Sequence, residues 1–331
     1  SGVKFPENDL LGIDLVIPDY DYVIKNKDKI NGIVLTHGHL DHIGGLPYLL
    51  KEINAPIYGT KLTLGLLEGN LKEHRLLKDT RLKVVNSGKK YQIGNFGVEF
   101  VRVNHSIADT CALAIDTPLG KIVYASDFKF DQTPIDGEVA DFHKLAELGD
   151  SEEGVLALFS DSTNVEREGY TLSEKVVGET VDEIFRDERE RIIIATFASN
   201  IHRVQQIVDA AFKYNRKIAF TGRSMLNNVD IARRLGYLQV PDDMIVDIRD
   251  CSDLPDSKVT LLTTGSQGEP YAALTRMARG DHYHINIKEG DTVMISASAI
   301  PGNEKLVGET INKLYRRGAN VIYEDVSGVH V

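Results

Sequence analysis

The chain has 331 residues, 42% of them hydrophobic and 26% charged, with a formal net charge of −11. This composition is typical of a globular protein with about two domains, and the negative charge argues against nonspecific coating of nucleic acid while leaving room for a local basic site. Two cysteines are too few for a disulfide framework and fit a reducing cytoplasm. No apolar run is long enough for a membrane span, and the first residues have no signal-peptide pattern.

Strand-like apolar runs alternate with helical patterns along most of the chain, which indicates an α/β architecture with largely buried sheets. A short helix is expected to begin at Ile43, and helical stripes are expected over residues 201–212 and 306–314. The polar segment 164–173 is the candidate domain boundary. The expected strands are residues 32–36, 98–103, 121–126, 155–159, 191–196, 217–220, 259–263, 292–296 and 320–323.

The first of these strands runs into the sequence THGHLDHIGG, residues 36–45. Residues two apart in extended backbone point the same way, so His37 and His39 can converge on one ion. Asp41 and His42 follow as the chain turns into the helix and can reach an adjacent position. Imidazole and carboxylate together suit zinc, and also manganese. The alternative, a set of exposed loop histidines, is disfavoured by this spacing.

Polar side chains also follow three later strands: His105, Asp127 and Asp161. Open α/β sheets bind their ligands at the carboxyl ends of the strands, so these residues are further candidates for the same site. Taken alone, His105 could be an ordinary loop histidine and Asp127 a helix cap. Their order after the strands favours a shared role.

The run H-x-H-x-D-H, followed by a separate histidine and a separate aspartate, resembles the signature of the metallo-β-lactamase superfamily. The resemblance implies that His37, His39 and His105 hold a first metal ion. It also implies that Asp41 and His42 belong to a second ion and that Asp127 bridges both.

A closer resemblance extends over essentially the whole chain, and it is to the ribonuclease J family of β-CASP nucleases. It is carried by the segments SDFKFDQTP (126–134), LFSDSTN (158–164), ATFASNIHR (195–203), TGRSM (221–225), TTGSQGEP (263–270) and SAIPGNE (298–304). The resemblance implies a metallo-β-lactamase αββα-type domain, residues 1–170, and an inserted β-CASP domain, residues 171–331. RNA would enter between them, and Asp161 would join Asp41 and Asp127 as a catalytic residue.

The same resemblance implies a cytoplasmic ribonuclease with endonuclease and 5′-to-3′ exonuclease activity. It implies two zinc ions, with manganese or magnesium as alternatives, which would activate water for attack on the phosphodiester. The substrate would be single-stranded RNA that carries a 5′-monophosphate. The protein would form a homodimer or homotetramer and could meet other RNA-decay proteins.

The chain departs from the family pattern at its two ends. The family's first motif would place an aspartate just before Ser1, and two later histidines, one of them a ligand of the second ion, would follow Val331. We therefore expect an internal segment whose second ion is held weakly. His330 is a weaker candidate for a replacement ligand.

Three strand-to-helix turns in the second half are candidates for binding phosphate, because helix N-termini favour anions. Plain helix capping is the alternative for each turn. A single-stranded RNA backbone could follow such an edge. The candidate residues are Ser199, Asn200, His202, Arg203, Arg223, Ser224, Ser266 and Gln267.

Two rival functions are a small-ester or lactam hydrolase and a noncatalytic RNA-binding subunit. A small-substrate enzyme would have little use for Arg203 and Arg223. A noncatalytic subunit should have lost metal ligands, and the first cluster is intact.

Overall fold

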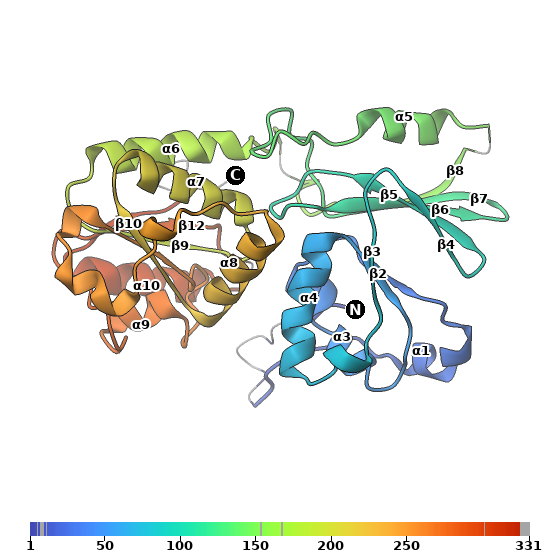
Figure 1. Cartoon of the computed structure of the whole chain (residues 1–331), viewed down its shortest axis with the longest axis horizontal. Coiled ribbons are helices and arrows are strands. Elements are labelled where there is room, and N and C mark those ends of the chain that lie inside the picture. The colour runs from blue at the N-terminus through green and yellow to red at the C-terminus, as the bar shows by residue number, and fades with distance from the viewer. Residues whose placement is uncertain are drawn as a thin grey trace. The chain divides into compact units, whose positions relative to one another are not determined.

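The computed structural model describes residues 1–4, 6, 10, 12–152, 154–166, 168–300 and 302–324. The chain divides into two compact units, which we call unit 1 (Ser1–Thr171) and unit 2 (Leu172–Val331). Each is shown with its labelled elements in Figure 1.

Unit 1 contains two sheets. A short parallel sheet has the strand order β1-β2-β3, and helix α4 (Lys61–Glu73) follows its middle strand. Its strands are β1 (Ile33–Val34), β2 (Ile57–Gly59) and β3 (Leu82–Val84). A larger sheet has the order β4-β5-β6-β7-β8, antiparallel except for the parallel pair β7–β8. Its strands are β4 (Lys90–Ile93), β5 (Phe96–Arg102), β6 (Cys111–Thr117), β7 (Gly120–Ser126) and β8 (Val155–Ser160).

Side chains alternate between the two faces of the larger sheet, and both faces carry apolar residues. One face, with Val98 and Phe100, packs against Val34 and Tyr58 of the short sheet. The opposite face, with Val101, packs against helix α5 (Phe142–Asp150), the crossover between β7 and β8. The result is the layered α/β arrangement expected for the first part of the chain.

Edge strand β8 departs from the expectation of buried sheets. Leu156, Leu158 and Phe159 are 55%, 63% and 57% exposed. The apolar run forms a strand as predicted, but more than half of each of these three side chains is exposed. An apolar sequence indicates that a strand can be buried, but it does not show which other residues would pack against it.

Unit 2 is a single parallel sheet with the strand order β10-β11-β9-β12-β13. Figure 1 shows α6 and α7 on one side of this sheet and α9 and α10 on the other. The strands are β9 (Ile192–Thr196), β10 (Lys217–Thr221), β11 (Val259–Thr263), β12 (Thr292–Ser296) and β13 (Asn320–Ile322). The helices are α6 (Glu174–Asp187), α7 (Ile201–Lys213), α8 (Arg223–Leu235), α9 (Ala273–Arg279) and α10 (Glu304–Arg316).

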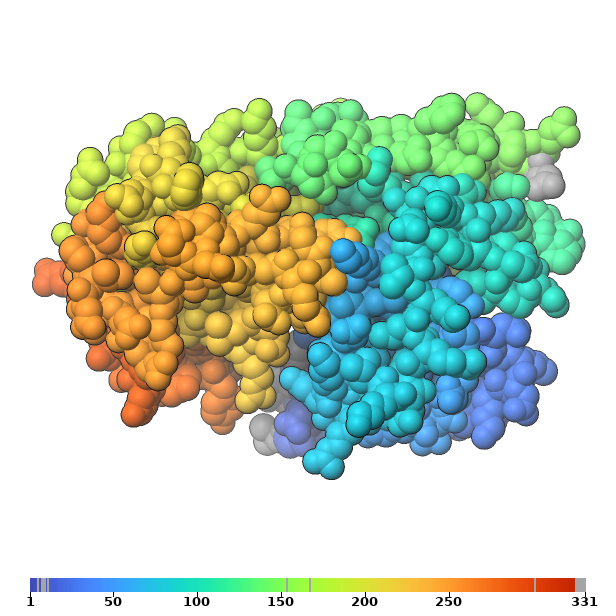
Figure 2. All heavy atoms as spheres, viewed as in Figure 1, coloured from blue at the N-terminus to red at the C-terminus, as the bar shows by residue number. Residues whose placement is uncertain are grey.

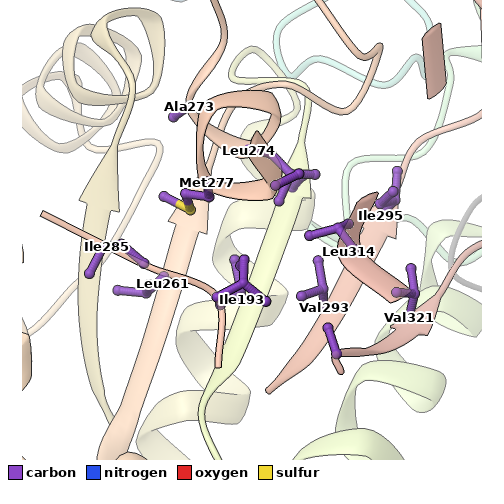
Figure 3. Close-up of a cluster of buried hydrophobic side chains, with 14 of the residues drawn as sticks. Ile193, Leu261, Ala273, Leu274, Met277, Ile285, Val293, Ile295, Leu314 and Val321 are labelled. Carbon is purple, nitrogen blue, oxygen red and sulfur yellow. The ribbon is translucent and has the colours of Figure 1, made fainter. Parts of the chain in front are cut away.

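The strands of unit 2 are buried on both faces, as near-continuous apolar sequences in parallel sheets are expected to be. Toward α9 and α10, Ile193, Leu261 and Val293 pack against Leu274 and Met277 (Figure 3). Side chains close over the strands in the space-filling view (Figure 2). At about 25 cal/mol per Å² of buried apolar surface, such a core supplies most of the stabilising free energy.

The remaining elements are short. They are α1 (Asp21–Lys25), α2 (Leu40–Ile43), α3 (Leu46–Leu49), η1 (Lys27–Lys29), η2 (Leu77–Asp79), η3 (Asp242–Met244), η4 (Ile248–Asp253) and η5 (Asp256–Lys258). Among the described helices, none has the length and apolar character that crossing a membrane requires.

All nine expected strands are present, with ends shifted by at most two residues. Strands β2, β3, β4 and β6 are present in addition to the expected ones. Two of these, β3 (LKV) and β4 (KYQI), carry polar side chains that mask the apolar signal.

Candidate metal centre

The candidate centre is built from strand ends of unit 1. His37 lies just after β1, His105 follows β5, and Asp127 follows β7 directly. His39 is the N-cap residue of helix α2, which carries Asp41 and His42 in its single turn. The change from extended chain to helix therefore places the first two histidines in one ligand group and the next two side chains in another. The helix begins at Leu40, three residues before the expected start at Ile43.

The described structure brings the six expected ligands together in two groups. His37, His39, His105 and Asp127 offer ligand atoms that all lie within 4.8 Å of one another. Asp41, His42 and Asp127 meet the same criterion, so Asp127 belongs to both groups. This is the arrangement that a pair of neighbouring ions with one shared carboxylate requires.

Asp127 Oδ2 lies at the centre of the cluster. It is 3.3 Å from His42 Nε2, 3.7 Å from His105 Nε2 and 3.8 Å from His37 Nε2. His42 Nε2 is also 3.5 Å from Asp41 Oδ2. The carboxylate is the one negative group toward which three of the ring nitrogens converge.

His39 and His105 face each other, with Nδ1 of the first 3.1 Å from Nε2 of the second. Without a cation, one of these nitrogens must carry a proton to form a hydrogen bond. An ion that accepts lone pairs from both would satisfy the same geometry.

The cluster shifts the proton affinities of its members. Burial, with the neighbouring imidazoles, lowers the pKa of His37 to about 2. Burial also lowers the pKa of His39, and it lowers the pKa of His105 to about 3. These three rings are therefore neutral near pH 7, the form that binds metals.

His42 and Asp127 shift each other's pKa. The hydrogen bond with His42 lowers the pKa of Asp127 to about 2, against the effect of burial. Burial would lower the pKa of His42, but its hydrogen bond and attraction to Asp127 outweigh that effect and raise it. The carboxylate is ionised at any pH at which the protein would work.

The donor set fits a divalent metal ion. Nε2 of His37 is fully buried and has no hydrogen-bond partner among the described residues, and such an orphaned buried nitrogen is costly. Three imidazoles and one carboxylate suit Zn²⁺ and the neighbouring transition metals. The chain thus has a His/Asp metal site of the kind typical of the metallo-β-lactamase fold.

Two hydroxyl groups that the sequence pattern does not indicate lie next to this site. Thr36 Oγ1 lies 3.1 Å from His37 Nδ1 and 2.9 Å from Ser126 Oγ. Thr36 and Ser126 directly precede ligands in the sequence, but 90 residues separate them. Nothing in a single sequence signals that they touch.

Asp161 follows β8, as expected, but belongs to neither ligand group. Its Oδ1 accepts hydrogen bonds from the backbone N–H and the hydroxyl of Thr163. Its charge opposes the lowering of the pKa of His105, so it lies near the site without joining it.

Several phosphate-binding candidates in unit 2 turn out to be internal. The prediction for Arg203 is wrong: its side chain is fully buried, ion-paired to Glu174 at 2.6 Å and bonded to Ser296. Asn200 is buried and caps helix α7 by accepting a hydrogen bond from the Arg203 N–H. An arginine in a sequence motif can thus be structural when a buried acid is available.

The loop GSQG (265–268) is a second correction. It was expected to open a helix, but α9 begins only at Ala273. Ser266 and Gln267 are buried, and the Gln267 side chain donates to the Ser298 carbonyl and accepts from the Ile300 N–H. The loop therefore ties together two connections of unit 2 and does not present these side chains to a ligand.

Four candidates remain accessible at the carboxyl edge of the unit 2 sheet. Ser199 and His202 are half-buried at the start of α7, after β9. Arg223 and Ser224 are exposed at the start of α8, after β10. His330 lies outside the described residues.

Two family models match the chain. Residues 15–147 match the β-lactamase superfamily domain, and residues 189–314 match the ribonuclease J β-CASP domain. The two matched stretches lie in units 1 and 2, respectively.

Relatives that match across the whole chain carry the name ribonuclease J. The chain is 48% identical to ribonuclease J of Synechocystis over 333 residues, 100% of this chain and 52% of the relative. It is 47% identical to the Thermus thermophilus ribonuclease J and 45% identical to the Bacillus subtilis ribonuclease J2, covering 100% of this chain and 58% and 59% of those proteins. The chain thus spans about half the length of these relatives.

A solved structure of a protein of unknown function from Enterococcus faecalis superposes with a TM-score of 0.67 at 15% identity, over 100% of this chain and 81% of that one. This likeness concerns the fold alone.

Proposed function

The chain belongs to the ribonuclease J family, whose members combine a metallo-β-lactamase domain with a β-CASP domain, and on that basis we propose that it is the core of a metal-dependent ribonuclease. The observation that carries the proposal is the convergence of six ligands on two overlapping positions, with Asp127 in both. We assign residues 1–170 to the metallo-β-lactamase domain and residues 171–331 to the β-CASP domain.

Zn²⁺ is the proposed ion at both positions, with Mn²⁺ or Mg²⁺ as alternatives. A bound divalent ion supplies Lewis acidity to a phosphodiester and lowers the pKa of water toward neutrality. His37, His39 and His105 would hold the first ion through neutral ring nitrogens, while Asp41 and His42 would serve the second. Because Asp127 stays ionised, it offers negative charge to both.

The residues around the ions then act by position and charge. Asp127 would serve both ions, because its carboxylate belongs to both ligand groups. Asp41 is exposed, with 67% of its side chain accessible, and can contact solvent or substrate. Asp161 adds negative charge beside His105. We propose that these three aspartates are the catalytic carboxylates.

RNA is the proposed substrate, single-stranded and carrying a 5′-monophosphate. In unit 2, the accessible Arg223 and Ser224 at the start of α8 are the proposed phosphate contacts, with Ser199 and His202 at the start of α7. Backbone N–H groups at a helix start and an arginine together favour phosphate. The proposed activity combines endonuclease and 5′-to-3′ exonuclease cleavage, in a cytoplasmic homodimer or homotetramer that could meet other RNA-decay proteins.

The test is cleavage of a 5′-labelled single-stranded RNA by the full-length gene product after metal removal and after reloading with Zn²⁺ or Mn²⁺. The wild type should cleave only when reloaded. His39→Ala and Asp41→Ala should each lower the rate by more than the about 10²–10³-fold that one transition-state contact is worth, because each disturbs an ion.

A matched control is His284→Ala, because His284 is an exposed histidine of unit 2 outside both ligand groups. It should cleave like the wild type. Full cleavage by both cluster variants, or cleavage by the metal-free protein, would refute the proposal.

A further inference from the structure

The hydroxyl pair Thr36 and Ser126 lies directly beneath the metal centre. Thr36 is buried after β1, and its carbonyl accepts a hydrogen bond from the Cys111 N–H at 3.0 Å, which fixes its backbone. Ser126 is the buried last residue of β7 and directly precedes Asp127. The two side chains connect the strand ends that carry the most buried histidine and the shared carboxylate.

We infer that Ser126 is a positioning residue that, through Thr36, holds the His37 ring in the tautomer whose Nε2 is free to bind metal. This inference rests on the proposed metal centre. It concerns one proton on one ring, and it can be tested in the protein without any metal.

The tautomer matters because a neutral imidazole has one N–H, and a metal-binding nitrogen must lack it. His37 Nε2 is the atom that faces the cluster, since Nδ1 is occupied by Thr36. For Nε2 to be free, Nδ1 must carry the proton and donate it to Thr36 Oγ1. The Thr36 hydroxyl must then donate its own hydrogen bond to an acceptor other than His37.

Ser126 is the one other side-chain partner of Thr36 Oγ1 within the described part of the chain, and its Oγ lies 2.9 Å away. With this acceptor present, the hydrogen bonds can run in one direction, from His37 to Thr36 to Ser126. Without it, the Thr36 proton has His37 Nδ1 as its remaining partner. Donation to Nδ1 would move the ring proton to Nε2.

The surroundings of the His37 ring favour the tautomer with its proton on Nε2, which cannot bind metal through that nitrogen. Asp127 Oδ2 lies 3.8 Å from His37 Nε2, and a carboxylate attracts an N–H. The hydrogen bonds of the Thr36 and Ser126 hydroxyls must therefore favour a proton on Nδ1, so that Nε2 stays free in the metal-free protein. Partners of this kind commonly fix the tautomer of metal-binding histidines.

The backbone at Ser126 supports a specific role. Its φ is +58°, in the left-handed region that glycine adopts readily and that other residues adopt uncommonly. A residue with a hydroxyl occupies a position where the backbone alone would favour glycine. The side chain therefore supplies something that glycine would not.

The experiment compares the wild type with Ser126→Ala and Ser126→Gly as full chains, because the two variants separate the hydroxyl from the backbone. Both lack the hydroxyl, but glycine relieves the left-handed backbone, so Ser126→Gly should unfold at a higher temperature than Ser126→Ala. Thr310→Val is a matched control that removes a buried hydroxyl bonded within α10 of unit 2.

Long-range ¹H–¹⁵N spectra of histidine-labelled, metal-free protein report which ring nitrogen is protonated. We expect His37 to carry its proton on Nδ1 in the wild type and in Thr310→Val, and to shift toward Nε2 in both Ser126 variants. Zn²⁺ affinity at the first position should fall by about 10- to 100-fold in the Ser126 variants.

A wild-type tautomer in either folded Ser126 variant would overturn the inference, whatever its metal affinity. So would a shift of equal size in Thr310→Val. The absence of ribonuclease activity in the wild type would challenge the proposed function and leave the tautomer result standing, so the two failures can be told apart.

Discussion

Protonation of single histidines should make the metal-free protein sensitive to acid. Burial lowers the pKa of His37 to about 2 and of His105 to about 3, whereas both titrate near 6.5 when the chain is unfolded. Below about pH 6.5 the unfolded chain therefore binds more protons than the folded chain, and the free energy of unfolding falls as the pH falls. His42, whose pKa is raised, contributes in the opposite direction but is outnumbered.

Urea unfolding of the metal-free protein at intervals between pH 7 and pH 4 measures this effect. Stability should decrease steadily over that range. His105→Ala should reduce the slope by about one proton, because the slope counts the difference in bound protons. A pH-independent free energy of unfolding would contradict the assigned burial of the cluster.

At the scale of elements, residues 1–3 hold helix α2 and the turn after it through backbone hydrogen bonds, which we call the clamp. The Val3 N–H donates to the Leu40 carbonyl, and the Gly45 N–H donates to the Ser1 carbonyl. A Cβ on Gly2 would lie 1.4 Å from the Asp41 carbonyl oxygen, so any side chain there must displace the backbone that carries Asp41.

Gly2→Ala should therefore weaken Zn²⁺ binding at the position served by Asp41 and His42 more than at the other position. Gly308→Ala in α10 has open space around the added methyl and is the matched control. It should be neutral or slightly stabilising, because alanine favours helices over glycine by about 1 kcal/mol. Equal metal binding in Gly2→Ala and wild type, measured by competition with a chromophoric chelator, would disprove the clamp.

The two arginines once grouped as phosphate contacts should behave differently. Arg203 joins α7 to α6 and β12 through Glu174 and Ser296. Arg203→Ala leaves a buried carboxylate unpaired and should destabilise the protein by about 3–5 kcal/mol. Arg223→Ala removes an exposed side chain and should change stability little.

RNA binding should depend on Arg223, the arginine whose replacement changes stability little. In the folded protein, Arg223→Ala should weaken binding and make it less dependent on salt, by about 0.7 in the log–log slope for each lost phosphate contact. Unchanged affinity and slope would remove Arg223 from the proposed RNA surface. A stable Arg203→Ala protein would show that the buried pair is dispensable.

How far the sequence predicts these elements depends on whether the signal is local. The alternation of His37 and His39 and the turn into α2 lie within a few residues, so their convergence follows from local geometry. The contact between Thr36 and Ser126, and the pairing of Arg203 with Glu174, join distant segments. Such contacts depend on how elements pack, which neither periodicity nor composition specifies.

For the molecule as a whole, the exposed apolar side chains of β8 are a distinctive surface. Leu156, Leu158 and Phe159 lie on an edge strand, where open backbone groups can pair with another chain. Leu158→Lys should raise the concentration at which the protein self-associates, because charge on an edge strand opposes pairing. Light scattering over a concentration series measures this, and equal self-association of variant and wild type would exclude β8 as the cause.

We propose that Asp127 joins two metal positions into one centre. Zn²⁺ titration of the metal-free chain, followed by native mass spectrometry, measures how many ions bind and how tightly. The wild type should take up one ion tightly at the group of four ligands, and a second more weakly at the group of three.

Asp127→Ala should weaken both steps, whereas Asp230→Ala, an exposed aspartate of α8, should weaken neither. Uptake of both ions by Asp127→Ala with wild-type affinity, or no uptake by the wild type, would refute a two-ion centre shared through Asp127.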